Sequence, residues 1–387
     1  MSRAPSTATL EKTAFWLLAA CLALVEFNLL TAQVVFGLAS LAWLKVAIDD
    51  RRWPDVPRFF WPLATFAGLT LVSALFSGSP ATSLVDSKQL VLFLIVPMAL
   101  RLARADRAAT ALNLIIAVGA ASALVGVVQS TMLGFDNLSN RPEGSLTHYM
   151  TYSGVIMLAL SAAVAQLLFG RHPWAWPAIA IPALTVALAL TLTRNAWIGA
   201  LAAMVCLLAL RRARLLLVIP VLVVVALVVA PASLRTRAAS IFDRQDASNR
   251  DRLQMIAMGQ RMIGDHPWFG VGPDTIKDVY PQYRPPDAVH PTNPHLHNVP
   301  VNIAAERGLP ALAAWLWCIG IAVWDLVRQV RQGPAKAVAA AGLGALVAML
   351  AAGLFEYNFG DSEFLMLLLG LMTLPYAARL PPRPVEP

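Results

Sequence analysis

The chain has 387 residues, of which 58% are hydrophobic and only 13% are charged, and its mean hydropathy is +0.63. Water-soluble domains average about 25% charged residues, so this composition excludes an ordinary soluble protein. The net charge of +8 would suit nucleic-acid binding. Most basic residues, however, flank apolar segments as topology signals, and we expect no nucleic-acid partner.

Twelve apolar runs of about 17–22 residues predict membrane-spanning helices, because each is long enough for a hydrocarbon core of roughly 30 Å. They are residues 13–30, 32–48, 59–76, 88–104, 108–130, 150–169, 174–190, 193–210, 214–231, 309–327, 336–355 and 362–379. The run 174–190 is short and contains two prolines, so we expect a kinked or tilted helix. The first run is too long for the apolar region of a signal peptide and lacks a cleavage motif, so we expect a retained anchor.

The distribution of basic residues sets the predicted orientation. With the N-terminus inside, the short outer segments hold only Lys88, Arg141 and Arg194. The cytoplasmic segments then hold Arg3, Lys12, Lys45, Arg51, Arg52, Arg58, Arg101, Arg104, Arg107, Arg171, Arg211, Arg212, Arg214, Arg328, Arg331, Lys336, Arg379 and Arg383. Since short cytoplasmic loops collect Lys and Arg, both termini are expected inside. The sequence therefore predicts an all-α membrane protein, with spans in residues 1–231 and 309–387 and a large outer loop at 232–308.

The outer loop is expected to contain short helices of its own. Residues 251–263 place apolar side chains at helical spacing, and residues 274–283 suggest a second short helix. Several prolines between residues 281 and 294 require rigid, extended chain. A further helix is expected from Asn298 to a turn at residues 308–310. His297 or Asn298 would then occupy its N-cap region.

Three of the six histidines, His290, His295 and His297, fall within eight positions of this loop. They suit three roles: metal ligands, a general base for a sugar hydroxyl, or exposed structural side chains. Neither a cysteine pair nor an H-E-x-x-H motif supports a metal, so no metal or other cofactor is expected. A histidine that titrates near neutral pH suits a base, and we favour His297 for that role.

Arginines supply the second candidate chemistry. Arg194 lies at a membrane boundary, where it either reaches along the lipid to the interface or forms an anion clamp at the outer face. Arg250 and Arg252 open the first loop helix and suit bidentate binding of a diphosphate, although an ordinary solvated ion-pair surface has the same composition.

Weaker signals occur elsewhere on the outer side. Arg141, His148 and Tyr152 surround the start of the sixth span and suit a substrate entry, although such residues are often merely solvated. Glu356 and Asp361 are placed at the outer rim, and we assign them no role. The three cysteines lie far apart inside apolar runs, so we expect buried small side chains and neither disulfides nor metal ligands.

Together these motifs resemble the O-antigen ligase family of bacterial envelope enzymes, within the O-antigen ligase and polymerase superfamily. The resemblance covers about residues 190–320 and rests on the order of several motifs. These are Leu-Thr-Leu-Thr-Arg194, Asn-Arg250-Asp-Arg252-Leu-Gln-Met, His-Pro-Trp-Phe-Gly270-Val-Gly272, His295-Leu-His297-Asn298 and Ala-Glu306-Arg307-Gly308-Leu-Pro.

The resemblance implies a GT-C-like membrane enzyme that acts at the periplasmic face of the bacterial inner membrane. Its donor would be an undecaprenyl-diphosphate-linked polysaccharide, and its acceptor a sugar hydroxyl of lipid A–core. The transfer would be inverting and independent of metal. His297 matches the family's base, and Arg194 and Arg252 match the arginines that neutralise the diphosphate. Ile256 stands where many members have Trp, which leaves Arg250 as an alternative to Arg252.

The remaining predicted contacts are with substrate and lipid. Arg250, Asn298, Arg141, His148, Tyr152 and His295 are expected to bind substrate, and the apolar spans are expected to contact membrane lipids and the polyprenyl tail. Within the superfamily, a polymerase or a protein O-oligosaccharyltransferase is the nearest alternative. A multispan transporter or flippase belongs to another class, but the spans are nearly free of the ionisable groups that transport requires.

Overall fold

A computed structural model describes residues 7–50, 55–170 and 176–382, and within these ranges the chain consists of helices and the turns between them. The bundle contains α1 (Thr7–Leu24), α2 (Leu29–Asp50), α3 (Phe60–Phe76), α4 (Pro80–Asp86), η1 (Ser87–Leu94), α5 (Ile95–Leu102), α6 (Asp106–Met132), α7 (Tyr149–Phe169), α8 (Pro177–Leu190), α9 (Arg194–Arg211), η2 (Ala213–Leu217), α10 (Val218–Val229), α14 (Val299–Gln332), α15 (Lys336–Ala352) and α16 (Ser362–Ala377).

Each of the twelve predicted apolar runs coincides with one of these helices, or with a 3-10 helix and the α-helix after it. The expected start of the seventh run, at residues 174 and 175, lies outside the described residues. In the described ranges, six helical segments are long and apolar enough to cross a membrane, and five shorter helices are apolar as well. The all-helical membrane fold is therefore confirmed.

One boundary differs from the sequence-based expectation. The first run was expected at 13–30, but α1 ends at Leu24 and a turn with the buried side chain of Glu26 precedes α2. The break expected at residues 308–310 is confirmed: α14 is kinked there, and Gly308 has a non-helical backbone with a φ of 82°. A Cβ at Gly308 would lie 2.2 Å from the carbonyl oxygen of Trp268. Glycine therefore permits both the kink and the close contact with the outer loop.

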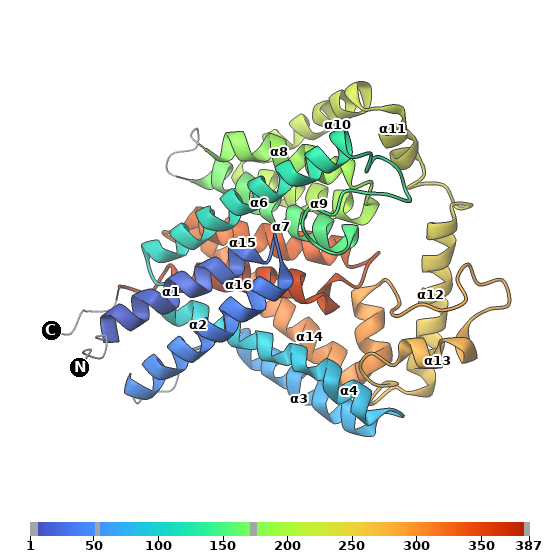
Figure 1. Cartoon of the computed structure of the whole chain (residues 1–387), viewed down its shortest axis with the longest axis horizontal. Helices are drawn as coiled ribbons and strands as arrows, with labels where there is room; N and C mark the ends of the chain where they lie inside the picture. Colours follow the sequence, from blue (N-terminus) through green and yellow to red (C-terminus); the bar gives the residue numbers. More distant parts are fainter. Residues whose placement is uncertain (1–6, 51–54, 171–175, 383–387) are drawn as a thin grey trace.

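The centre of the bundle is formed by α7, α15 and α16 (Figure 1), and most of their residues are buried. Small residues allow these helices to approach closely, as at Gly199 of α9, where a Cβ would lie 2.7 Å from the carbonyl oxygen of Ala348. At the periphery, α10 buries none of its residues although nearly all of them are apolar. Apolar side chains on the outside of the bundle are expected where lipid is the solvent.

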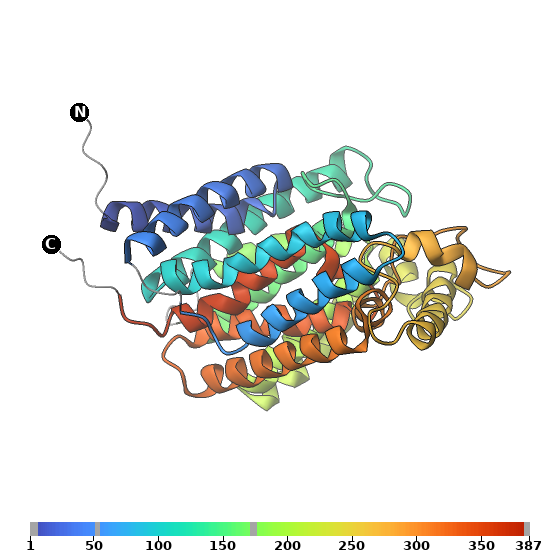
Figure 2. The ribbon, with the colours of Figure 1, turned by 90° about the horizontal axis from the view of Figure 1, so that it is seen from below.

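The outer loop folds at the end of the bundle opposite to the beginning of α1 and the end of α16 (Figure 2). It contains α11 (Ala232–Ala239), α12 (Ala247–Asp265), α13 (Ile276–Tyr283) and the first turns of α14. The helices predicted at 251–263 and 274–283 are thus confirmed with shifted starts. The first begins at Ala247 because the Asp246 side chain accepts a hydrogen bond from the Asn249 N–H (3.1 Å) and caps the helix. The loop has a small core of its own, made of Met255, Met258, Met262, Val271, Ile276, Tyr280, Leu296 and Ala305.

Candidate active site

Two imidazoles and one carboxylate meet where the outer loop joins the bundle. His297 Nδ1 lies 2.8 Å and His295 Nε2 lies 3.0 Å from the same oxygen, Oε1 of Glu356. The imidazole rings are 4.5 Å apart between centroids and nearly perpendicular. The side chains of Glu356 and His297 are only 8% and 16% exposed, so these contacts are largely removed from water. When Nδ1 of His297 donates to Glu356, its Nε2 carries the lone pair that a base requires.

The backbone holds this arrangement from both sides. His297 has a φ of 47°, a left-handed conformation that costs a side-chain-bearing residue about 1–3 kcal/mol. Asn298 follows as the N-cap of α14: its Oδ1 accepts from the Val301 N–H (3.0 Å) and its Nδ2 donates to the Leu354 carbonyl (3.0 Å). The Val299 N–H also donates to the Gly353 carbonyl (2.7 Å). The start of α14 is therefore fastened to the turn that carries Glu356.

His295, His297 and Glu356 interact electrostatically. Burial alone would raise the pKa of Glu356, but the charge of His297 and the hydrogen bonds from both imidazoles hold that pKa well below its usual range. Burial alone would lower the pKa of His295, but the hydrogen bond and the charge of Glu356 raise it above its usual value. Glu356 is thus an ionised carboxylate that favours a proton on His295. No role for Glu356 follows from the sequence, in which its place on the outer side between the last two spans is the one available signal.

Arg194 is the first residue of α9, and its guanidinium is buried rather than spread along the membrane surface. Its Nη1 donates to the carbonyl and the hydroxyl of Ser240 (2.7 and 2.9 Å), and its Nη2 lies 2.9 Å from Oδ1 of Asp246. The residue is only 5% exposed. A buried and paired guanidinium differs from one that reaches along the lipid to the interface, and the anion clamp stays a prediction.

Arg252 contacts the turn that carries Glu356, whereas Arg250 lies on an exposed part of the same helix. Arg252 Nε donates to the carbonyl of Phe355 (2.8 Å), the residue before Glu356, and its Nη1 donates to Ser248. Burial lowers the pKa of Arg252, Glu356 raises it, and Arg194 lowers it further. Of the two arginines left open by the sequence, Arg252 is the one that contacts the residue before Glu356, and its catalytic role stays a prediction.

A third arginine, Arg237 of α11, was missed because nothing in its local sequence distinguishes it. Its Nε donates to the carbonyl of Leu192 (3.1 Å), and its Nη1 lies 3.7 Å from Oδ2 of Asp246. Burial lowers its pKa to about 10, together with repulsion from Arg194 and Arg141. Arg141 stacks over the ring of Tyr149 at 4.2 Å, and burial and the charge of Arg194 lower its pKa. Several guanidiniums thus gather within electrostatic reach of one another.

A cavity of about 310 Å³ opens beside His295. This volume is at the lower end of the range of about 300–1,000 Å³ for small-molecule sites. His148 and Thr151 line one wall, and Asn195, next to Arg194, also contributes. Its carboxylates are Asp86, Asp274, Glu306, Glu356 and Asp361. Carboxylates accept hydrogen bonds from hydroxyl groups, so the lining suits a polyhydroxylated ligand.

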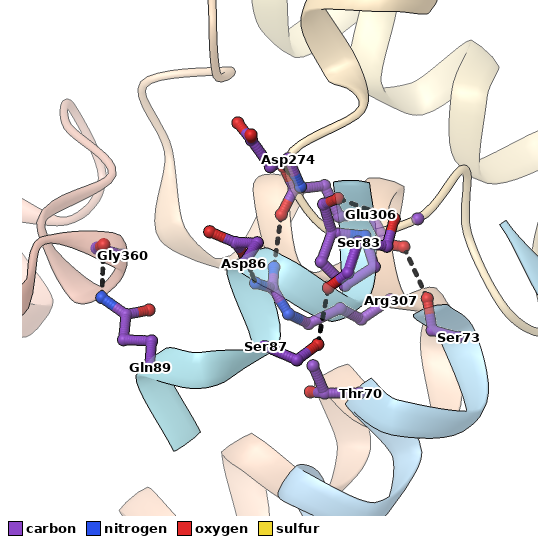
Figure 3. Close-up of polar contacts among 12 residues, drawn as sticks. Thr70, Ser73, Ser83, Asp86, Ser87, Gln89, Asp274, Glu306, Arg307 and Gly360 are labelled. Carbon is purple, nitrogen blue, oxygen red and sulfur yellow. Dashed lines mark hydrogen bonds and ion pairs between the residues drawn. The ribbon is translucent and has the colours of Figure 1, made fainter. Parts of the chain in front are cut away.

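A buried polar network, part of which lines this cavity, attaches the loop to α3 and α4 (Figure 3). Arg307 hydrogen-bonds to Glu306, lies 3.6 Å from Oδ2 of Asp86, and donates to the Tyr357 hydroxyl (3.0 Å). Ser73 donates to the carbonyls of Phe269 (2.6 Å) and Glu306 (2.9 Å). A dashed line at Ser73 in Figure 3 marks such a contact. The position of the loop on the bundle thus depends on hydrogen bonds and ion pairs between buried polar groups.

Glycines of the Gly270-Val-Gly272 motif allow the outer loop to pack closely against α14 and the end of α3. Gly270 has a φ of 67°, and a Cβ there would lie 2.4 Å from the carbonyl oxygen of Glu306. Gly272 has a φ of 111°, and a Cβ would lie 2.1 Å from Oγ of Ser77. The motif therefore serves packing between the loop and the bundle rather than contact with a ligand.

Three residues expected to bind substrate have structural tasks in the fold. Tyr152 is wholly buried and its hydroxyl donates to the carbonyl of Ser122 (3.0 Å), so it does not line an entry. Asn298 uses both polar atoms in capping and fastening α14. His148 caps α7 by accepting from the Met150 N–H (3.2 Å), although it also lines the cavity. His290 is exposed and lies 3.9 Å from Asp251.

The histidine pair with Glu356 also offers three ligand atoms within 4.8 Å of one another, which is a possible metal set. A carboxylate, which the local sequence around these histidines does not supply, is therefore present beside them. However, tetrahedral zinc with bonds of about 2.0–2.1 Å would separate its ligand atoms by about 3.3 Å. The observed separations of 2.8 and 3.0 Å are those of direct hydrogen bonds.

Fold and site together define a multispan membrane protein with a polar centre under its outer loop. Residues 178–316, about a third of the chain, match the family model described as O-antigen ligase, so the chain carries an O-antigen ligase domain there. The domain indicates the O-antigen ligase and polymerase family of lipid-linked glycan transferases, as the resemblance predicted. A comparison with curated proteins gave no match. The match includes Arg194, Arg252 and both site histidines, whereas Glu356 lies beyond it.

Proposed function

We propose that this protein is an O-antigen ligase. It transfers a polysaccharide from undecaprenyl diphosphate to a sugar hydroxyl of lipid A–core at the periplasmic face of the bacterial inner membrane. The observation that carries the proposal is the contact of His297 with Glu356 beside Arg252, which places a base next to positive charge. A glycosyl transfer from a diphosphate requires both, because a proton must leave the acceptor and negative charge develops on the leaving group.

In the proposed reaction, the acceptor oxygen attacks the anomeric carbon while its proton moves to Nε2 of His297. The bond between that carbon and the diphosphate oxygen breaks, and the electron pair leaves with the diphosphate. Glu356 stabilises the imidazolium that forms, as a carboxylate does beside a catalytic histidine. Arg194 and Arg252 compensate the charge of the leaving diphosphate, which requires no metal ion. A single displacement of this kind inverts the configuration of the sugar.

The cavity suits the acceptor sugar. It borders His295 and Glu356, and its carboxylates include Asp361, which accepts a hydrogen bond from the Thr151 hydroxyl (2.6 Å). Sugar hydroxyls are donors that such carboxylates bind in an orientation-dependent way. The donor's long polyprenyl chain would lie among the apolar helices, and the arginines near the ends of α9 and α12 would meet its diphosphate at headgroup level.

The proposed membrane topology has twelve spans with both termini in the cytoplasm and the loop of residues 232–308 in the periplasm. The opposite placement of the loop and the beginning of α1 in the bundle supports this orientation (Figure 2). The basic residues of the short segments support it as well. A polymerase or a protein O-oligosaccharyltransferase would use the same chemistry with another acceptor.

The decisive experiment is reconstitution of the purified protein in nanodiscs with lipid-linked polysaccharide and lipid A–core, without nucleotide. Attachment of the polysaccharide to the core supports the ligase, lengthening of the lipid-linked chain supports a polymerase, and absence of both products contradicts the proposal. His297→Ala should reduce transfer by roughly 10²- to 10⁴-fold. His290→Ala is the matched control, because its imidazole is exposed and outside the His295–His297–Glu356 cluster. Equal rates for the two variants would refute the role of His297 as the base.

A further inference from the structure

The turn that presents Arg194 is strained and is supported by Arg237. Leu192, two residues before Arg194, has a φ of 53°, an unfavourable left-handed conformation for a leucine. Arg237 Nε donates to the carbonyl of this same leucine (3.1 Å). Arg237 is therefore hydrogen-bonded to the backbone that positions Arg194, and this bond limits how far the two guanidiniums can move apart.

One carboxylate bridges the two arginines. Oδ1 of Asp246 lies 2.9 Å from Nη2 of Arg194, and Oδ2 of the same side chain lies 3.7 Å from Nη1 of Arg237. An anion that directs one oxygen to each of two guanidiniums reproduces how phosphate groups are bound by paired arginines. The N-terminus of α12, where Asp246 is the cap, adds partial positive charge at the same place.

The positive charge here exceeds what Asp246 compensates. Arg141, Arg194, Arg237 and Arg252 interact electrostatically, and burial together with mutual repulsion lowers the pKa of Arg141, Arg237 and Arg252. The other carboxylates nearby have partners, since Glu356 binds the histidines and Asp251 faces His290. A partly buried group of cations with one carboxylate between them suits an anion of higher charge.

We propose that Asp246 is an internal counter-ion that occupies the diphosphate position between Arg194 and Arg237, and that the donor diphosphate displaces it. Arg237 is then a third arginine of the donor site. That the diphosphate belongs to a lipid-linked donor rests on the proposed function. Displacement does not require α12 to unfold, because the Asn249 side chain still holds the preceding turn through the carbonyls of Ser240 (3.0 Å) and Asp243 (2.7 Å).

The test measures binding of inorganic pyrophosphate to the full-length protein in nanodiscs by calorimetry. Asp246→Asn removes the charge but keeps a good helix N-cap. We expect it to bind pyrophosphate about tenfold more tightly than the unmodified protein, because a competing ion pair is lost. Asp243→Asn is the control, since this exposed aspartate of the same turn caps the Gln245 N–H (2.8 Å) and should leave the affinity unchanged. Weaker or unchanged binding by Asp246→Asn would overturn the proposal that Asp246 is a counter-ion.

Arg237 is tested in the same assay. Arg237→Gln should weaken pyrophosphate binding about tenfold, and Arg237→Lys should recover part of the loss because it restores the charge without the planar fork. Arg235→Gln, on an exposed part of the same helix, should bind like the unmodified protein. Unchanged affinity in Arg237→Gln would remove Arg237 from the site. Melting curves of each variant identify any that fail to fold, and the lysine variant then decides.

A second arm uses a short-chain polyprenyl diphosphate in place of pyrophosphate. The same order of variants with this lipid supports a donor headgroup as the ligand, whereas binding of pyrophosphate alone would overturn the assignment to a lipid. Neither arm depends on transfer. If Asp246→Asn binds more tightly but the unmodified protein makes no transfer product, the ligase is refuted and the counter-ion role of Asp246 is kept. If the unmodified protein transfers polysaccharide but Asp246→Asn does not bind more tightly, the ligase is kept and the counter-ion role is refuted.

Discussion

Replacing Glu356 by glutamine tests the centre of the proposed site. The carboxylate accepts contacts of 2.8 and 3.0 Å from two imidazoles, and hydrogen bonds to charged groups contribute about 1.5–3 kcal/mol each. Glutamine keeps one acceptor but presents an N–H₂ group and no charge. The His297 ring then loses the partner that selects its tautomer and stabilises its protonated form. From this loss we expect the transfer rate to fall roughly 10²- to 10⁴-fold.

The assay is the initial rate of transfer from lipid-linked polysaccharide to lipid A–core in nanodiscs, followed by the shift of the core band on a gel. Glu143→Gln is a matched control, because Glu143 lies in the outer segment before α7 and outside the cavity lining. A Glu356→Gln rate within about threefold of the unmodified protein would refute the reasoning, since the loss of an orienting carboxylate is worth far more. A large loss in the Glu143→Gln control would show that the assay reports general damage.

The same substitution has a pH signature. The pKa of Glu356 is held below its ordinary value of 4.5, so its contribution to stability is present above that pH and is lost as the pH falls through the lower folded-state pKa. The pKa of His295 is raised above 6.5, so its contribution is complete below 6.5 and is lost as the pH rises through the raised pKa. The difference in Tm between the unmodified protein and Glu356→Gln should thus be larger at pH 6 than at pH 9. A difference that does not vary with pH would contradict the charged pair.

Four further predictions address other parts of the site. Arg252→Gln should lower the transfer rate by about 10²-fold or more, as loss of a transition-state donor does. The control Arg250→Gln, at an exposed residue, should change the rate less than threefold, and similar losses in both variants would contradict the assignment to Arg252. Tyr152→Phe should lower stability by about 1 kcal/mol through a lost buried hydrogen bond and leave the KM for acceptor unchanged, and a raised KM would restore its place at an entry. Gly270→Ala should lower Tm strongly because its Cβ meets backbone, whereas Gly264→Ala in α12 meets open space and should not; equal melting would refute the packing argument. EDTA should leave transfer unchanged, and a loss that zinc restores would make the His295, His297 and Glu356 group a metal site.

The sequence predicted the helices well because their signal is local. An apolar run long enough for a membrane is visible in composition alone, and the prediction of an N-cap at His297 or Asn298 is confirmed at Asn298 by its bond to the Val301 N–H. The start of α12 was missed by four residues because its first turn is polar and is held by Asp246 rather than by apolar contacts. Local patterns thus gave the elements but misplaced some of their ends.

The missed site residues depend on contacts distant in sequence. Glu356 reaches a histidine 59 positions earlier, and Asp246 pairs with an arginine 52 positions earlier. No periodicity relates such positions, and a single sequence offers no covariation. Tyr152 shows the opposite error, because a tyrosine beside polar loop residues looks accessible although its ring fills the space over Gly126 and Gly144. Burial of that kind follows only from the packing of α6 against α7.

The left-handed backbone at His297 means that glycine would suit this position better than the residue it holds. His297→Gly should therefore melt at a higher temperature than His297→Ala, because glycine adopts a φ of 47° without strain. It also leaves a vacancy shaped like the missing ring beside Glu356. Soluble imidazole can then enter and act in place of the side chain, so chemical complementation would separate the work of the ring from that of the backbone. Under the proposed role of His297, the strained backbone is a stability cost that accompanies the position of the base.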